Sequence, residues 1–375
     1  MTTKTTTITR RLVALDVDGT LVDTHGLASA ATHQAVDLAR AAGHELVLAT
    51  GRSLAGLMPV ARQLGLTDGW AAGSNGALLV RLDPTAPSGY IVQDAHLFEP
   101  RQVIRRAQDL VRGVVIAIED VGVGWRVSRR LPDGALNGPQ TLTSVADLCA
   151  TPATRVALVG SGIRRFTDAL AATGATVTAA GSDWLDVVGP GVSKATTLDQ
   201  IRQQLDLPVD ATVAVGDGMN DCDMLTWAGR GVAMGHAAAR VRHAADETTG
   251  SLTDDGAATV LRSLVPTTAL DSGLSPLAAQ LAAAVDSSPS AMTLRVWHGT
   301  GPALTSVTAW LLDDGPWRTH APIPAGTGAT MRDVENAATE ARLAYPAADI
   351  ALRARWRRTT LTDGPTSYEL PLYRD

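Results

Sequence analysis

The sequence predicts an α/β protein: a Rossmann-like parallel sheet with an inserted α+β module and a separate small α+β domain at the C-terminus. Apolar runs that end in polar or acidic turns occur at 12–18, 44–53 and 211–221, with helix-like segments between them. Repeated strand, turn and helix segments are typical of a parallel α/β sheet. Between the second and third runs the pattern changes to paired strands joined by short glycine turns, which predicts the inserted module.

The N-terminal part of the parallel sheet is predicted first. Its opening run, Leu-Val-Ala-Leu, is apolar throughout and therefore predicts a strand buried on both faces. The helices after it end at Gly43 and Gly65, residues that commonly follow a helix C-terminus. The expected elements are a strand at 12–15, a helix at 28–42, a strand at 44–50, a helix at 53–64, and a strand-like segment at 70–75 that leads into a polar turn at 74–76.

The inserted module is predicted at 78–188. Its expected strands are 91–97, 114–118, 125–130, 155–159 and 176–180, and its expected helices are 99–112, 144–150 and 164–173. The parallel pattern then resumes. Ser193 is a candidate N-cap, and the elements expected after it are a helix at 194–205, a strand at 211–215, a short strand at 231–234 and a helix at 237–245.

The C-terminal segment begins after a cluster of Pro, Thr, Ser and Gly at 266–275, which predicts a boundary. The predicted division is 1–77 with 189–265 for the core, 78–188 for the inserted module and 275–375 for the C-terminal domain. In the last of these we expect helices at 276–285 and 331–344 and strands at 292–298, 305–312 and 350–356. Arg353, Arg355 and Arg357 alternate with less polar residues, which favours a solvated edge strand over an anion-binding patch.

Composition excludes several classes of protein. A formal charge of −6 gives no general attraction to nucleic acid or to anionic membranes. No apolar run approaches the length of about 18 residues needed to span a bilayer, and the N-terminus lacks a signal-peptide pattern. The two cysteines, Cys149 and Cys222, form no metal-binding or disulfide pattern. We therefore expect a cytoplasmic protein, with its oligomeric state left open.

Candidate functional residues gather where these strands end. Asp16 and Asp18 follow the first strand, Thr50 follows the second, Lys194 begins a helix, and Asp217 and Asp221 follow the 211–215 strand. Open parallel sheets place their ligand sites at this edge. Two acids as close as Asp16 and Asp18 repel each other unless a cation or a proton lies between them. This set of acids, hydroxyl and lysine meets the needs of metal-assisted phosphoryl transfer.

Four motifs in this order resemble those of the haloacid dehalogenase superfamily: Asp16-Val17-Asp18-Gly19-Thr20, Thr50-Gly51-Arg52, Lys194, and Gly216-Asp217-Gly218-Met219-Asn220-Asp221. The position of the insert, with the flanking pieces 74–77 and 189–194, resembles the Cof-type subfamily with its large α/β cap (subfamily IIB). The resemblance covers about residues 11–262 and leaves the C-terminal domain without a recognised relative.

The resemblance implies roles for matching residues. Asp16 would be the nucleophile that forms an aspartyl-phosphate, and Asp18 would be the general acid and base. Mg²⁺ would be held by Asp16, the backbone carbonyl of Asp18 and Asp217, with Asp221 as a further ligand or a support for the ligands. Thr50, Gly51, Lys194 and Asn220 would bind the phosphate.

Each motif alone has an ordinary structural explanation, and only their joint occurrence favours catalysis. Arg52 is a candidate substrate contact or a surface ion-pair residue. Asn75 is a candidate substrate contact or a turn residue. Trp125 and Trp184 could stack on a sugar, although packing is the more common role of such residues.

The function that the resemblance implies is a Mg²⁺-dependent phosphatase for small phosphorylated metabolites, in particular sugar phosphates. A phosphosugar mutase or phosphotransferase would use the same motifs, so it stays open as an alternative. A binding or scaffold protein acting through the C-terminal domain, which holds Trp297, Trp310, Trp317 and Trp356, is an alternative from another class.

Overall fold

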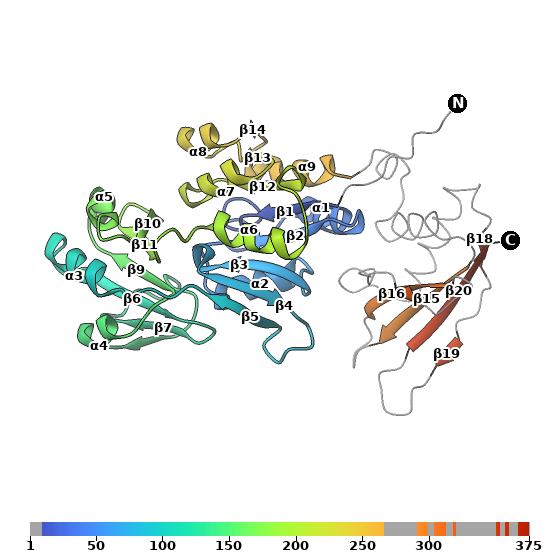
Figure 1. Ribbon diagram of the computed structural model, residues 1–375, viewed down its shortest axis with the longest axis horizontal. Helices are drawn as coiled ribbons and strands as arrows, with labels where there is room; N and C mark the ends of the chain where they lie inside the picture. The colour runs from blue at the N-terminus through green and yellow to red at the C-terminus, as the bar shows by residue number, and fades with distance from the viewer. Residues whose placement is uncertain are drawn as a thin grey trace. The chain divides into compact units, whose positions relative to one another are not determined.

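The computed structural model describes residues 10–265 and six strand segments between 291 and 374. Within residues 10–260, all but 37–43 belong to one compact unit, and the strands beyond residue 290 belong to another. The first unit contains two sheets, and the second contains a third sheet (Figure 1).

Eight strands form the first sheet, in the order β14, β13, β12, β1, β2, β3, β4, β5. Neighbours from β14 to β3 run parallel, and β4 and β5 add to one edge in antiparallel pairing. This confirms the predicted parallel core. The strands are β1 (Leu12–Leu15), β2 (Glu45–Ala49), β3 (Gly69–Gly73), β4 (Leu78–Leu82), β5 (Tyr90–Ala95), β12 (Thr212–Gly216), β13 (Arg230–Ala233) and β14 (Glu247–Thr248).

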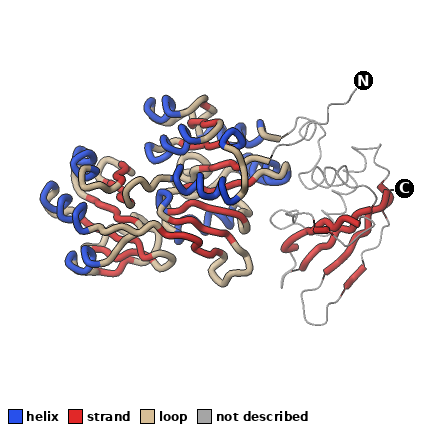
Figure 2. Tube along the Cα trace, viewed as in Figure 1, coloured by secondary structure: helices blue, strands red, loops and turns tan. Residues whose placement is uncertain are grey.

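Helices accompany this sheet (Figure 2), and those predicted at 28–42, 53–64, 194–205 and 237–245 are present, whereas α7 and α9 were not predicted. All four residues of β1 are buried, because a central parallel strand is covered on both faces. Leu12 and Ala14 pack in one cluster with Leu198 of α6 and Met224 of α7. The helices are α1 (Ala30–Ala41), α2 (Leu54–Gln63), α6 (Lys194–Gln204), α7 (Cys222–Trp227), α8 (Ala239–Ala244) and α9 (Gly256–Ser263), with short 3-10 turns η1 (Ser74–Gly76), η3 (Val209–Ala211), η4 (Met219–Asp221) and η5 (Leu252–Asp254).

The pairing of β4 and β5 corrects the expected start of the inserted module at residue 78. After η1 the chain turns back on β3, with Gly73 opposite Leu78, so this hairpin extends the core sheet. Leu78 and Val80 are fully buried. Antiparallel pairing does not distinguish an insert from a mixed edge on a parallel sheet, because both have the same local pattern.

The second sheet contains six strands in the order β10, β11, β9, β6, β7, β8, antiparallel except between β7 and β8. Strands β8 and β11 were not predicted. The elements of this inserted module are α3 (Arg101–Leu110), β6 (Val115–Asp120), β7 (Gly124–Val127), β8 (Gln140–Leu142), α4 (Val145–Ala150), β9 (Arg155–Val159), η2 (Ile163–Phe166), α5 (Thr167–Ala171), β10 (Thr176–Ala179) and β11 (Trp184–Val188).

The two faces of this second sheet differ in chemistry. Ile116, Ile118, Leu185 and Val187 share a core cluster with side chains of α3, α4 and α5. Because strand side chains alternate between faces, the intervening residues point to the opposite side. These include three buried charged residues, Glu119, Arg155 and Asp186.

The third sheet confirms the strands predicted at 292–298 and 305–312. Its strands are β15 (Ala291–His298), β16 (Leu304–Leu312), β17 (Arg318–Thr319), β18 (Ile350–Leu352), β19 (Arg357–Thr359) and β20 (Ser367–Arg374). The last of these was not predicted, yet it pairs with β15, β18 and β19. The predicted helices at 276–285 and 331–344, and residues 353–356 of the expected edge strand, lie outside the described residues. Among the helices that the structure describes, none has the length and apolar character of a membrane span.

Candidate active site

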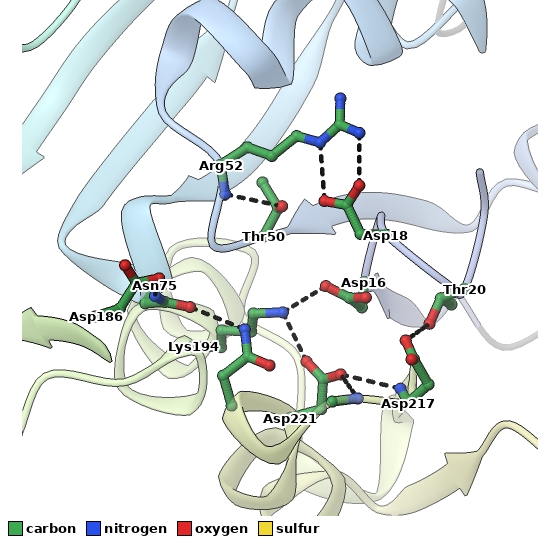
Figure 3. A network of polar contacts seen from close by, with 12 residues as sticks. Asp16, Asp18, Thr20, Thr50, Arg52, Asn75, Asp186, Lys194, Asp217 and Asp221 are labelled. Atoms are coloured by element: carbon green, nitrogen blue, oxygen red, sulfur yellow. Dashed lines mark hydrogen bonds and ion pairs between the residues drawn. The ribbon is translucent and has the colours of Figure 1, made fainter. Parts of the chain in front are cut away.

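Four chain segments meet at the carboxyl edge of the first sheet, as predicted. Asp16 directly follows β1, Thr50 follows β2, and Asp217 follows β12. Lys194 is the first residue of α6, whose N-cap Ser193 accepts a hydrogen bond from the backbone N–H of Thr196. Parallel strands and a capped helix start therefore bring together side chains that are far apart in the sequence (Figure 3).

Lys194 is buried between two carboxylates. Its Nζ lies 2.5 Å from Asp16 Oδ1 and 2.6 Å from Asp221 Oδ1. Burial alone would lower the pKa of Lys194, but the charges of Asp16 and Asp221 and the hydrogen bonds to both outweigh burial and raise it. The lysine is therefore a fixed positive charge at the base of the site.

The acids around Lys194 carry more negative charge than the lysine offsets. Burial, followed by the charge of Asp221, raises the pKa of Asp16 to about 7. Burial and the charge of Asp16 raise the pKa of Asp217 to about 6. Carboxylate oxygens of Asp16, Asp217 and Asp221 lie within 4.8 Å of one another. Clustered hard oxygen donors with excess negative charge suit Mg²⁺, so this donor set fits the predicted ion.

Asp221 holds the turn after β12. Its Oδ2 accepts hydrogen bonds from the backbone N–H groups of Asp217, at 3.0 Å, and Gly218, at 2.7 Å. Its Oδ1 accepts from Lys194. Because both oxygens are engaged by the protein, Asp221 is better placed to fix Lys194 and Asp217 than to bind an ion directly.

Asp217 is oriented from two sides. Thr20 Oγ1 donates to its Oδ1 at 3.0 Å, and His236 Nε2 lies 3.5 Å from its Oδ2. Gly19, at φ 81°, permits this approach, because a Cβ there would lie 2.6 Å from Asp217 Oδ2. His236 is exposed, follows β13 and belongs to none of the four motifs, so its sequence position carries no signal of this contact.

Asp18 and Arg52 form a two-pronged ion pair above this cluster. Arg52 Nη2 lies 2.5 Å from Asp18 Oδ1, and Arg52 Nε lies 2.8 Å from Asp18 Oδ2. Hydrogen bonding to Asp18 raises the pKa of Arg52. Arg52 also donates to the backbone carbonyl of Gly56. Of the two roles considered for Arg52, the structure shows the ion pair, and its partner is the candidate general acid.

Asn75 and Asn220 contact each other. Asn220 Nδ2 donates to Asn75 Oδ1 at 2.9 Å, and Asn75 Nδ2 donates to Asp186 Oδ2 at 3.0 Å. Both residues line the same cavity. Thr50 Oγ1 accepts from the backbone N–H of Arg52 at 3.1 Å, which leaves its hydroxyl hydrogen available to a ligand.

A cavity of about 650 Å³ lies between this sheet edge and the inserted module. This is a usual size for a small-molecule site. Asp16, Asp18 and Arg52 contribute to one side of it, and Trp125 and Arg155 to the other. Trp125 is buried, and the Arg155 guanidinium lies 5.1 Å from the centroid of its ring. The Nε1 of Trp125 donates to the backbone carbonyl of Asn137. Packing within the module therefore accounts for Trp125.

Comparison with known proteins identifies the family. The profile of the haloacid dehalogenase-like hydrolases matches residues 13–109 and 161–261. The chain belongs to this family. Its second, mixed sheet forms the cap of this α/β fold, and phosphatases are among the similar proteins.

Two similar proteins come from Bacillus subtilis. Phosphatase YwpJ is 25% identical over 295 residues, covering 68% of this chain and 100% of its own length. The 5-amino-6-(5-phospho-D-ribitylamino)uracil phosphatase YitU is 27% identical over 267 residues, covering 67% and 96%.

Solved structures of this family are also similar. BT1666, a haloacid dehalogenase-superfamily protein from Bacteroides thetaiotaomicron, has a TM-score of 0.58 at 25% identity, covering 69% of this chain and 97% of its own. The subclass IIB sugar phosphatase BT4131 has a TM-score of 0.59 at 22% identity, covering 68% and 98%, which shows the shared fold. Each of these relatives covers about two thirds of this chain, and the family profile ends at residue 261.

Proposed function

We propose that this chain is a Mg²⁺-dependent phosphatase that hydrolyses phosphate monoesters of small metabolites through an aspartyl-phosphate on Asp16. The observation that carries the proposal is the buried Asp16–Lys194–Asp221 group. Its Asp16 lines the cavity, which the inserted module borders on the other side. A carboxylate can attack an anionic phosphate only where nearby positive charge offsets the repulsion. Lys194 supplies part of that charge.

The first half-reaction transfers the phosphoryl group to Asp16. One carboxylate oxygen of Asp16 forms a bond to phosphorus while the bond from phosphorus to the leaving oxygen breaks, and Asp18 gives its proton to that oxygen. Thr50 and backbone N–H groups near Val17 and Gly51 would donate to the phosphoryl oxygens. Because Arg52 pairs with Asp18 as a carboxylate, Asp18 must exchange this partner for a proton before it can act as an acid.

The second half-reaction returns Asp16 to its starting state. Asp18, now a carboxylate, takes a proton from water whose oxygen attacks phosphorus, and the bond between Asp16 and phosphorus breaks. Mg²⁺, held by the carboxylates of Asp16 and Asp217 and the backbone carbonyl of Asp18, would neutralise charge on the phosphoryl group. Lys194 stays protonated throughout because its two carboxylate partners raise its pKa.

Charge in the cavity wall favours an uncharged leaving group. Arg155 is paired with Asp186, and Arg52 is paired with Asp18 until Asp18 takes up a proton, so the wall offers at most one arginine to a charged leaving group. Trp125, Leu136 and Trp184 add apolar surface to the wall. A monophosphate whose leaving group is a sugar or another neutral polyol fits this wall better than a bisphosphate or a phosphorylated carboxylate.

A substrate panel tests the proposal. The purified protein with Mg²⁺ would be incubated with hexose and pentose monophosphates, a sugar bisphosphate and 3-phosphoglycerate, and free phosphate would be measured. We expect phosphate release to be fastest with the neutral monophosphates. Isomerised sugar without free phosphate would indicate a mutase instead, and no turnover on the whole panel would contradict the proposal.

A further inference from the structure

The Ser74–Gly76 turn that joins β3 to β4 is held in an unusual conformation. Ser74 has φ 51° and Asn75 has φ 56°, both in the left-handed region that non-glycine residues rarely adopt. Both residues are buried, so this is not a tolerant surface turn. Such a conformation is strained and persists only where surrounding contacts fix it.

The contacts that fix Asn75 come from two different parts of the unit. Its Nδ2 donates to Asp186 of the inserted module at 3.0 Å, and its Oδ1 accepts from Asn220 of the turn after β12 at 2.9 Å. A carboxylate can only accept, so Asp186 dictates that the amide nitrogen faces the module and the amide oxygen faces Asn220. Figure 3 shows the Asn75 side chain beside Asp186.

The far end of this bridge is rigid. Asp186 also accepts from Arg155 Nη2 at 2.9 Å on each oxygen and from Trp184 Nε1 at 3.0 Å. Four donated hydrogen bonds leave the carboxylate little freedom to move. Ser74, the neighbour of Asn75, adds a second link to the module by donating to Glu119 Oε2 at 2.6 Å.

The near end of the bridge touches the catalytic machinery. A Cβ on Gly76 would lie 2.0 Å from the carbonyl oxygen of Ser193, the residue before Lys194. Thr197 Oγ1, one turn along α6, donates to the carbonyl of Gly76. Asn220, the partner of Asn75, precedes Asp221, which holds Lys194 and the turn of Asp217.

We propose that Asn75 is a positioning residue that couples the wall of the inserted module, through Asp186, to the phosphate end of the site, through Asn220. This inference rests on the proposed phosphatase function and assigns to Asn75 and Asp186 a role that acts through other residues. The side-chain oxygen of Asn75 and one of its amide hydrogens are both hydrogen-bonded within the protein, to Asn220 and Asp186. Through these two bonds it fixes the turn of Asn220 relative to the module. Contacts of the leaving group with the module thereby affect phosphate binding.

The test compares Asn75→Gly, Asp186→Asn and the double variant. Glycine adopts a positive φ without strain, so Asn75→Gly removes the bridging side chain and keeps the turn. Asp186→Asn keeps the shape but weakens the acceptor. The readout is the inhibition constant of orthovanadate against hydrolysis of p-nitrophenyl phosphate with Mg²⁺, alongside KM, kcat and the melting temperature. Inorganic phosphate binding, measured by calorimetry, gives a readout that does not need turnover.

We expect each single variant to weaken vanadate and phosphate binding by roughly tenfold. The double variant should bind these anions no more weakly than the more affected single variant, because the effects of residues in one network do not add. Asn137→Gly is the matched control: Asn137 lines the same cavity without a hydrogen bond to the phosphate end, and it should change KM for metabolites while vanadate binding stays constant. Multiplied effects in the double variant, or unchanged vanadate and phosphate binding in Asp186→Asn, would overturn the coupling.

The proposed function and the coupling fail in different ways. If the wild type releases phosphate but the variants behave independently, the phosphatase stands and the bridge does not. If the wild type shows no turnover, the phosphatase proposal fails, and phosphate calorimetry still decides between coupled and independent effects of Asn75 and Asp186.

Discussion

The two sides of the cavity are built in opposite ways. On the side of the first sheet, Asp16, Thr50 and Asp217 lie in turns just beyond strand ends. Asp16 and Asp217 are held by residues of other segments, Lys194 and Thr20. On the side of the inserted module, Arg155 and Asp186 project from one face of a sheet. The edge of the first sheet is suited to chemistry on the phosphate group. The inserted module forms the wall that the leaving group would contact.

The first way to test this comparison is to remove the nucleophile. Replacing Asp16 by Asn should lower kcat by roughly ten-thousandfold or more, because an amide cannot form the acyl-phosphate. Phosphate release and far-ultraviolet circular dichroism would be measured together. Asp210→Asn, the same change at an exposed turn, serves as the control. Substantial turnover by a folded Asp16→Asn protein would disprove the assignment of the nucleophile.

The second test removes the charge beneath the nucleophile. Lys194→Met leaves Asp16 and Asp221 buried without their cation, and breaking a buried ion pair costs about 3–5 kcal/mol. We expect a large loss of stability in urea unfolding and a fall in kcat of roughly a thousandfold. Arg230→Met removes one partner of an exposed pair with Glu247 and should cost about 1 kcal/mol or less. Equal stability of the two variants would argue against a buried charge cluster.

The third test concerns metal and pH. EDTA should stop turnover and Mg²⁺ should restore it. Without metal, folding raises the pKa of Asp16 to about 7 and of Asp217 to about 6, above their ordinary value of 3.8. Carboxyl groups with raised folded pKa values favour the folded state most at low pH, and this contribution is lost as pH rises from about 4 to 7.

The melting temperature of the metal-free protein should therefore fall between about pH 4 and pH 7 relative to that of Asp217→Asn. This variant lacks the Asp217 carboxyl group and reports the effect of pH on the rest of the protein. Mg²⁺ should reverse the fall, and its apparent affinity should rise with pH because binding displaces protons. An Mg²⁺ affinity that is constant between pH 5 and 8 would contradict a site made of Asp16 and Asp217.

The same contrast explains what the sequence could and could not predict. The strand ends of the core were predictable because each apolar run stops at a polar turn, and the position of Lys194 followed from the N-cap Ser193. The gathering of these turns at one edge follows from parallel connections. The edge hairpin of β4 and β5 was misassigned because local pattern does not say which sheet a strand joins.

The wall of the inserted module was harder to predict. A signal existed: Arg155 and Asp186 are each the single charge in an otherwise apolar strand, and a buried charge needs a partner. What the sequence lacks is the register that brings β9 beside β11, so Arg155 and Asp186 could not be paired in advance. The bridge through Asn75 depends on that register and on a positive φ that serine and asparagine rarely adopt.

The smallest expected effect lies where the module touches the core. The Asn137 side chain packs against Gly56 in the first turn of α2, and a Cβ on Gly56 would lie 2.5 Å from Asn137 Nδ2. Gly56→Ala should raise KM for metabolites by roughly fivefold, equivalent to about 1 kcal/mol of overpacking. The melting temperature should not fall, because alanine favours the helix.

Asn137→Gly tests whether this contact is the cause. It removes the atoms that the new methyl group would meet, so the double variant Gly56→Ala, Asn137→Gly should show the KM of Asn137→Gly alone. A KM that stays raised in the double variant would place the effect within α2, near Arg52 and its hydrogen bond to Gly56 O, and not at the wall. The difference in KM between Gly56→Ala and the double variant measures how much the contact between Gly56 and Asn137 contributes to substrate binding.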